Sequence, residues 1–217
     1  MRFDITDNVI VRALSKICDM VCLNVLWLVC SIPIITIGAS TAALYTVMLK
    51  MVKNEEGYIF RGFFKAFKSN FRQSTIMWLI LLLLGIICWI DYRVSGMMPG
   101  TAGLIMRSIF LLAGFILLSV INYAFPLTAR YENSIRATFR NALLLTIGKL
   151  PYTILMAAVV AAAVIASLWN TVTLMFALPL WLIIGVSLIA WINSCILRRV
   201  FLIFEDGETK NSTEEEG

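Results

Sequence analysis

The sequence predicts an all-α fold: a polytopic transmembrane helical bundle of five or six membrane helices plus a cytoplasmic interfacial amphipathic helix. Hydrophobic residues make up 60% of the 217 residues and charged residues 14%, and the mean hydropathy is +0.89. Soluble domains contain roughly 45–50% apolar and about 25% charged residues. The apolar residues also gather in long charge-free runs, and a helix needs about 20 such residues to cross a bilayer. We therefore interpret the chain as an integral membrane protein whose first partner is the lipid bilayer.

Four charge-free runs mark the predicted spans: 20–49, 73–90, 108–129 and 150–197. The last run is too long for one crossing and contains Trp169-Asn170-Thr171, a polar sequence that suits a tight turn. It is expected to divide into spans near 151–168 and 172–197. We assign 1–204 to a single transmembrane domain. For the acidic tail, 205–217, we expect disorder, because so polar a segment cannot bury enough apolar surface.

The run 20–49 allows two interpretations, because Pro33 and Gly38 interrupt it. Proline lacks a backbone N–H and clashes with the preceding helical turn. The run is therefore either one kinked crossing or a hairpin of two shorter helices, with the helix break at Pro33 and Gly38.

The distribution of Lys and Arg favours the hairpin, because cytoplasmic loops are enriched in both residues. A hairpin leaves only Arg93 and Arg107 outside, whereas a single crossing adds Arg2, Arg12 and Lys16 to the outer side. We therefore prefer six helices and keep five crossings as the alternative. Both arrangements place the C-terminus in the cytoplasm.

The segment "YIFRGFFKAFKSNFRQ" precedes the span at 73–90, and residues 58–72 are predicted to form the amphipathic helix. At 100° per residue its five Phe fall in one sector and its four cations in the sector beside it. The stripes consist of Phe60, Phe63, Phe64, Phe67 and Phe71, and of Arg61, Lys65, Lys68 and Arg72. This pattern is typical of a helix in the bilayer interface, and it suits either a surface anchor or a docking face for a cytoplasmic partner.

Nucleic acid is excluded as a partner, because stacking platforms need aromatic rings exposed to the bases, and here they form a continuous apolar stripe beside a membrane. A second basic segment, 130–151, repeats apolar residues at helical spacing with Arg136 and Arg140 alongside. It is expected to be an element of the same kind.

The predicted spans contain the polar residues Asn24, Asn122 and Asn193 but no Asp, Glu, Lys or Arg. Intramembrane charges usually mark coupled transport or catalysis, so we expect these amides to serve interhelical hydrogen bonding. The chain has no His, which removes the commonest general base and metal ligand, and it has no phosphate-binding loop. The five cysteines are interpreted as buried thiols. We expect no catalytic residue, metal or cofactor, and hence no enzyme.

Three stretches resemble one known family: 23–52 with Asn24, Trp27 and Pro33; the run 54–75; and "RYENSIRATFRNALLL" at 130–145. The chain is similar to the YesL family of Gram-positive bacterial membrane proteins, a domain of unknown function. The resemblance implies a multi-pass protein of the bacterial cytoplasmic membrane. It also implies an accessory role in ABC-type carbohydrate uptake, through contacts with permease or ATPase subunits. The alternative is a small-solute channel or facilitator in its own right.

Overall fold

The computed structural model describes the backbone of residues 9–55 and 57–215 and the side chains of residues 11–55 and 57–202. Every element in this part of the chain is helical, and six of the helical segments are long and apolar enough to cross a membrane. The elements are α1 (Val9–Cys30), η2 (Ile34–Thr36), α2 (Ile37–Lys53), α3 (Ile59–Ser95), α4 (Gly100–Arg130), α5 (Ile135–Gly148), α6 (Leu150–Leu168), α7 (Thr171–Leu180), η3 (Trp181–Gly185) and α8 (Val186–Glu215). The chain is thus an all-α, multi-pass membrane protein, as its composition predicts.

The first charge-free run forms a hairpin. Residues 31–36 separate α1 from α2, and Pro33 lies in this break as predicted. The helices return antiparallel, because Lys16 Nζ near the start of α1 donates to Asn54 Oδ1 just after α2, at 2.6 Å. Closer to the break, Trp27 Nε1 donates to Thr41 Oγ1 at 3.1 Å. The six-helix interpretation therefore agrees with the structure, and the single kinked crossing does not.

Gly38 differs from its predicted place, because it lies inside the first turn of α2 and not in the break. A side chain at this position would collide with the Ser74 carbonyl and with Trp78 Cβ on α3. Its function in the fold is close helix packing: small residues let two helical backbones approach each other in a membrane.

Helix α2 is the centre of the molecule. In its membrane-length window 61% of the residues are buried, against 11–22% in the other five. Its buried side chains are mostly small at the start, in the sequence "GASTAA" from Gly38 to Ala43. Helices α3, α4 and α8 pack around it.

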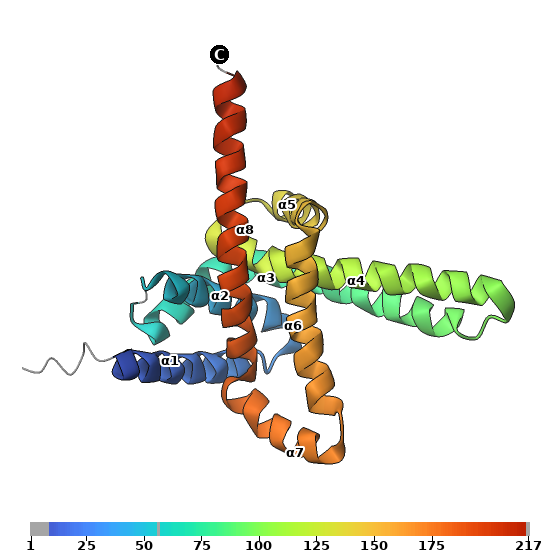
Figure 1. The fold of residues 1–217 in the computed structure, drawn as a ribbon, viewed down its shortest axis with the longest axis horizontal. Helices are drawn as coiled ribbons and strands as arrows, with labels where there is room; N and C mark the ends of the chain where they lie inside the picture. Colours follow the sequence, from blue (N-terminus) through green and yellow to red (C-terminus); the bar gives the residue numbers. More distant parts are fainter. Residues whose placement is uncertain (1–8, 56, 216–217) are drawn as a thin grey trace, which may run out of the picture.

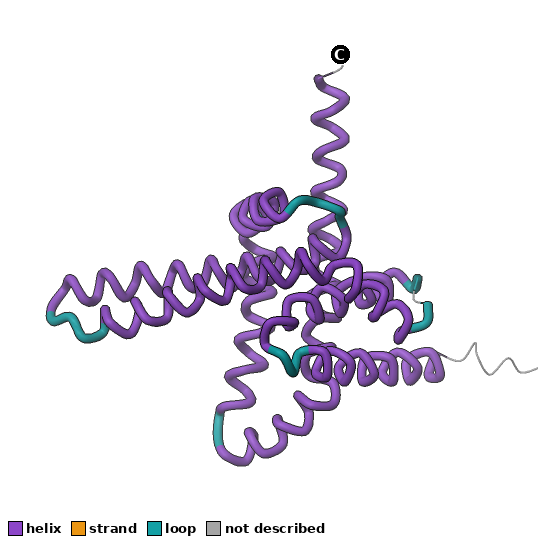
Figure 2. Tube along the Cα trace, turned by 180° about the vertical axis from the view of Figure 1, so that it is seen from behind, coloured by secondary structure: helices purple, strands orange, loops and turns teal. Residues whose placement is uncertain are grey.

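The remaining helices form two hairpins that point in different directions (Figure 1). Helices α3 and α4 lie side by side as an arm that extends away from α1 and α2, and the view from behind shows the same arrangement (Figure 2). Helix α6 descends to α7, and the chain returns through η3 and α8 across the base of that arm. Short loops join the helices (Figure 2). Many large apolar side chains of the arm are exposed, as expected for helices that face lipid.

The predicted turn at Trp169-Asn170-Thr171 separates α6 from α7. The Asn170 side chain accepts from Thr173 N at 2.8 Å, and Thr173 Oγ1 accepts from Asn170 N at 3.0 Å. This reciprocal pair satisfies two backbone donors at the start of α7. The resulting spans, Leu150–Leu168 and Thr171–Leu202, agree closely with the predicted 151–168 and 172–197.

Helix α8 continues to Glu215, over a segment for which the sequence predicts disorder. Extending an existing helix requires no new nucleus, so a polar sequence without proline can follow an apolar helix in the same conformation. The extension projects away from the other helices (Figure 1). Residues 216 and 217 lie outside the described part of the chain.

Candidate functional site

The predicted amphipathic helix at 58–72 forms the first part of α3. It is not a separate interfacial element, because α3 runs without interruption from Ile59 to Ser95. No proline occurs in this range, and the apolar span follows Arg72 directly. At about 1.5 Å per residue, a helix of 37 residues measures roughly 55 Å, against roughly 30 Å for the hydrocarbon core. The start of α3 therefore projects beyond the bilayer core.

The Phe stripe is divided between the interior and the surface. Phe63 is fully buried at 0% exposure and stacks against the partly buried Phe67, with ring centroids 6.3 Å apart. Phe60, Phe64 and Phe71 are exposed by 58%, 48% and 40%. The buried face of α3 continues through Ala66 and Ser74, so the stripe is one edge of the face that packs into the bundle. Only its outer edge is available to lipid or to a partner.

All four cations predicted on this helix are exposed. We call these cations, with Phe60, Phe64 and Phe71, the α3 basic face; they are Arg61, Lys65, Lys68 and Arg72. Within the described residues none of the four makes a hydrogen bond or an ion pair. Two of them, Arg61 and Lys65, line a cavity of about 300 Å³ together with Lys50, Glu55, Tyr58 and other residues. The α3 basic face is therefore a positively charged surface with exposed aromatic rings.

The second basic segment is also helical and meets the first. Ser134 caps α5 by accepting from Ala137 N at 3.3 Å, and Arg136 and Arg140 are exposed on this helix. Gln73 Nε2, just after the α3 basic face, donates to Asn133 O at 2.8 Å. The Gln73 side chain thus fixes the base of α3 against the loop that leads into α5.

The three intramembrane amides have different environments. Asn24 is fully buried and bonds to the η3–α8 junction. Asn193 is also buried; it lies beside the Tyr45 hydroxyl but forms no hydrogen bond of good geometry. Asn122 donates to Leu118 O in its own helix at 3.2 Å. None of the three lines any of the five cavities described for the molecule, and the structure does not bring them together.

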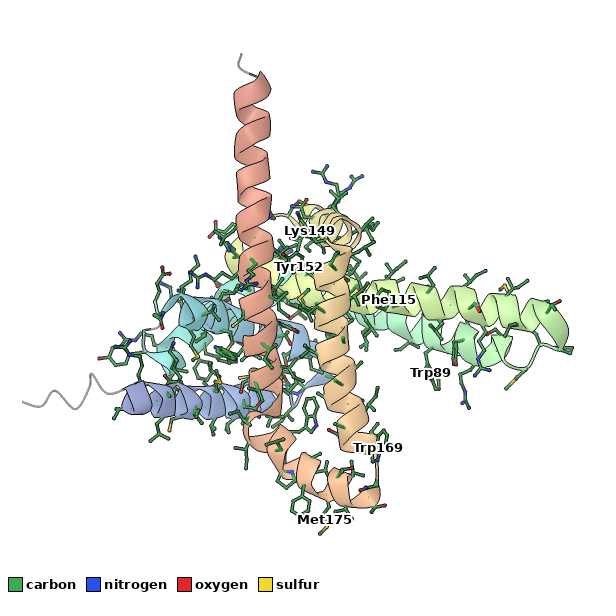
Figure 3. The ribbon with its side chains drawn as sticks, viewed as in Figure 1. Trp89, Phe115, Lys149, Tyr152, Trp169 and Met175 are labelled. Atoms are coloured by element: carbon green, nitrogen blue, oxygen red, sulfur yellow. The ribbon has the colours of Figure 1, made fainter. Side chains whose placement is uncertain are left out.

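Sequence reasoning missed a second cluster of cations, formed by Lys16, Arg198 and Arg199 around one cavity. These residues come from the first and last spans, so no local pattern connects them. One signal was present: the hairpin topology places all three on the same side of the membrane. Figure 3 shows Lys149 and Tyr152 at this end of α6, and Trp169 and Met175 at the opposite end.

Comparison with known proteins places the chain in a group without assigned function. The family described as "Protein of unknown function, DUF624" matches residues 20–92, which cover the second half of α1, all of α2 and most of α3. The "Uncharacterized protein YteU" of Bacillus subtilis (strain 168) is 30% identical over 144 residues, 64% of this chain and 64% of YteU. The "Uncharacterized protein YesL" of the same organism is 27% identical over 158 residues, 71% of this chain and 74% of YesL.

The chain thus spans just under two thirds of the length of YteU and about three quarters of that of YesL. No solved structure matches it. The family match and both relatives agree with the resemblance found in the sequence motifs at residues 23–52 and 54–75. The chain therefore carries a domain of the YesL family, a domain of unknown function.

Proposed function

We propose that this protein is a non-catalytic accessory component of the bacterial cytoplasmic membrane that acts by binding a partner protein. The α3 basic face carries this proposal, because it combines exposed Phe rings with four cations that have no partner among the described residues. Aromatic and arginine side chains are enriched at protein–protein interfaces. Since family resemblance associates such proteins with carbohydrate uptake, we propose a permease or ATPase subunit of an ABC-type sugar importer as the partner.

A surface anchor is the simpler explanation of the same residues, and two observations support docking as the alternative. The start of α3 is already held by buried Phe63 and by the hydrogen bond from Gln73 to Asn133. Six membrane-length helices retain the chain in the bilayer without further help. The exposed edge of the stripe is therefore not needed for anchoring, and this supports a separate use.

A channel or facilitator has less support. Such a function predicts a polar path, and the best candidates for its lining were Asn24, Asn122 and Asn193. Asn24 is engaged with backbone groups, and none of the three lines a described cavity. Solute flux into liposomes that contain only this protein would favour the channel over our proposal.

Charge reversal on the α3 basic face separates docking from anchoring. The test variant is Arg61→Glu with Lys65→Glu and Lys68→Glu, and the control is Arg136→Glu with Arg140→Glu on α5. Both variants and the wild type are tagged and purified in mild detergent from sugar-grown cells. We expect transporter subunits to copurify with the wild type and the control but not with the test variant, at equal membrane content.

Two other results would contradict the proposal. If the test variant no longer inserts into the membrane, the face is a lipid anchor. If even the wild type recovers no permease or ATPase subunit, the partner assignment is wrong.

A further inference from the structure

A second basic site lies between four helices at the end of the bundle where α6 begins. It is a cavity of about 610 Å³, within the range of roughly 300–1,000 Å³ that small-molecule sites occupy. Lys16 comes from α1, Asn54 follows α2, Tyr152 comes from α6, and α8 contributes residues between 191 and 202. In Figure 3, Tyr152 lies with Lys149 at the end of α6 opposite Trp169. The predicted topology places this end at the cytoplasmic surface.

The charge of the cavity is positive. Its lining includes Lys16, Arg198 and Arg199 and, among the side chains described for residues 11–55 and 57–202, contains no Asp or Glu. Asp19 lies one helical turn from Lys16 on α1 but does not line the cavity. Three cations that share a concave site repel one another unless an anion joins them, so the site selects for negative charge.

Two of the cations have neutral partners that orient them. Lys16 Nζ donates to Asn54 Oδ1 at 2.6 Å, and Arg198 Nη1 donates to Val52 O at 3.4 Å. Asn54 is itself fixed as the left-handed cap of α2, with φ of 56°. Each bond uses one donor: the Lys16 ammonium has three N–H donors and the Arg198 guanidinium has five. Both side chains therefore keep donors for a ligand. Arg199 makes no hydrogen bond or ion pair with any described residue, so no such contact within the described chain explains its position at the cavity.

The rest of the lining is apolar and aromatic. Met51, Leu155, Trp191 and Ile196 form walls beside the cations. A free inorganic anion has no use for such walls, whereas the glycerol and acyl part of a lipid would pack on them. Trp and Tyr are also typical of the level at which lipid headgroups lie.

We propose that this cavity binds a phosphate group through Lys16, Arg198 and Arg199, independently of the docking function of α3. Arg recognises phosphate through paired N–H donors, and Lys binds it as a point charge. Basic pockets between membrane helices at the cytoplasmic surface suit anionic headgroups. The phosphate belongs to an anionic phospholipid or to a soluble phosphate compound, and the apolar walls favour the lipid.

The test variant is Arg199→Gln, because this side chain is exposed and makes no hydrogen bond or ion pair with a described residue. The control is Arg140→Gln, an exposed Arg of α5 that does not line the cavity. Purified full-length protein in neutral detergent is titrated with phosphatidylglycerol and with phosphatidylcholine of the same acyl chains, and bound lipid is counted by native mass spectrometry. We expect the wild type and Arg140→Gln to prefer phosphatidylglycerol. Arg199→Gln should bind it about tenfold more weakly, the effect of losing one charge-assisted hydrogen bond.

A parallel titration identifies the source of the phosphate. Sodium phosphate is compared with sodium chloride at equal ionic strength by the shift in thermal unfolding temperature. A shift that needs Arg199, without preference for phosphatidylglycerol, assigns the site to a soluble phosphate compound. Equal binding of both lipids together with no effect of phosphate overturns the proposal. An equal loss in Arg140→Gln overturns it too, since binding would then follow net charge alone.

Discussion

Asn24 connects two parts of the chain that are far apart in sequence. Its amide donates to Trp181 O at 3.0 Å and to Leu182 O at 2.8 Å, and its Oδ1 accepts from Ser187 N at 3.0 Å. The two carbonyls belong to the π-helical turn η3, where the regular i to i+4 pattern is interrupted, and Ser187 follows in the first turn of α8. One side chain of α1 therefore satisfies three backbone groups of the α7–α8 connection.

Replacing Asn24 by Leu should destabilise the fold by about 2–4 kcal/mol. Each buried polar group left without a partner costs about 1–3 kcal/mol, while interhelical bonds in membranes average only about 0.6 kcal/mol. The thermal unfolding temperature in detergent should fall by roughly 5–10 °C. Asn122→Leu is the matched control, since Asn122 bonds only within its own helix, and it should change this temperature little. Equal losses in both variants would show that the interhelical bonds contribute nothing specific.

At the scale of one element, α3 shows what helical periodicity can and cannot predict. The spacing of the five Phe residues correctly indicates a helix with one apolar edge. It does not say how far that edge turns toward the interior, because this depends on α2, which packs on α3 and shares one core cluster with Phe63 and Ala66. The separate interfacial helix was wrong for a related reason: nothing ends the helix before the span begins.

Neighbouring Phe residues on α3 test this division. Phe63→Ala removes a fully buried ring and should cost about 3–5 kcal/mol, whereas Phe64→Ala removes a half-exposed ring and should cost less than about 1 kcal/mol. Thermal unfolding in detergent measures the difference. The recovery of partner per amount of purified protein should show the opposite order. Phe64→Ala should recover less partner, whereas Phe63→Ala should mainly lower the yield of folded protein. A comparable loss of stability in both would place Phe64 in the core.

Breaks between elements were predictable where their chemistry is local. The turn at Asn170 is set by a side chain that caps the next helix, and the break at Pro33 by a missing backbone donor. Gly38 could not be interpreted from sequence alone, because its reason is the Ser74 carbonyl of another helix. The cluster of Lys16 with Arg198 and Arg199 likewise exists only after the first and last spans meet.

At the scale of the whole molecule, the number of spans followed from composition but their arrangement did not. Hydropathy marks all six segments as long and apolar enough to span, with the lowest value, 1.4, for the segment that contains α2, but it does not show that this segment alone is mostly buried. Its small residues permit close approach, as at Gly38 against Ser74 and Trp78 of α3, whereas many large apolar residues of the other helices are exposed and suit lipid. The two hairpins therefore share one core around α2 and point in different directions from it (Figure 1).

The predicted topology places the α3–α4 loop and the α6–α7 turn on the same outer side of the membrane. Met98 and Trp169 mark these two ends, and both side chains are exposed, by 47% and 76%. We replace the five native cysteines by Ser and introduce Met98→Cys, Trp169→Cys or Lys149→Cys. A membrane-impermeant thiol reagent should label the first two in intact cells, and Lys149→Cys only after permeabilisation, because the positive loops stay inside.

Each result has a structural consequence. Labelling of Met98→Cys and Trp169→Cys from opposite sides would refute the six-span topology. External labelling of Lys149→Cys would place the C-terminus outside. If the prediction holds, two ends that point in different directions in Figure 1 must reach one membrane surface.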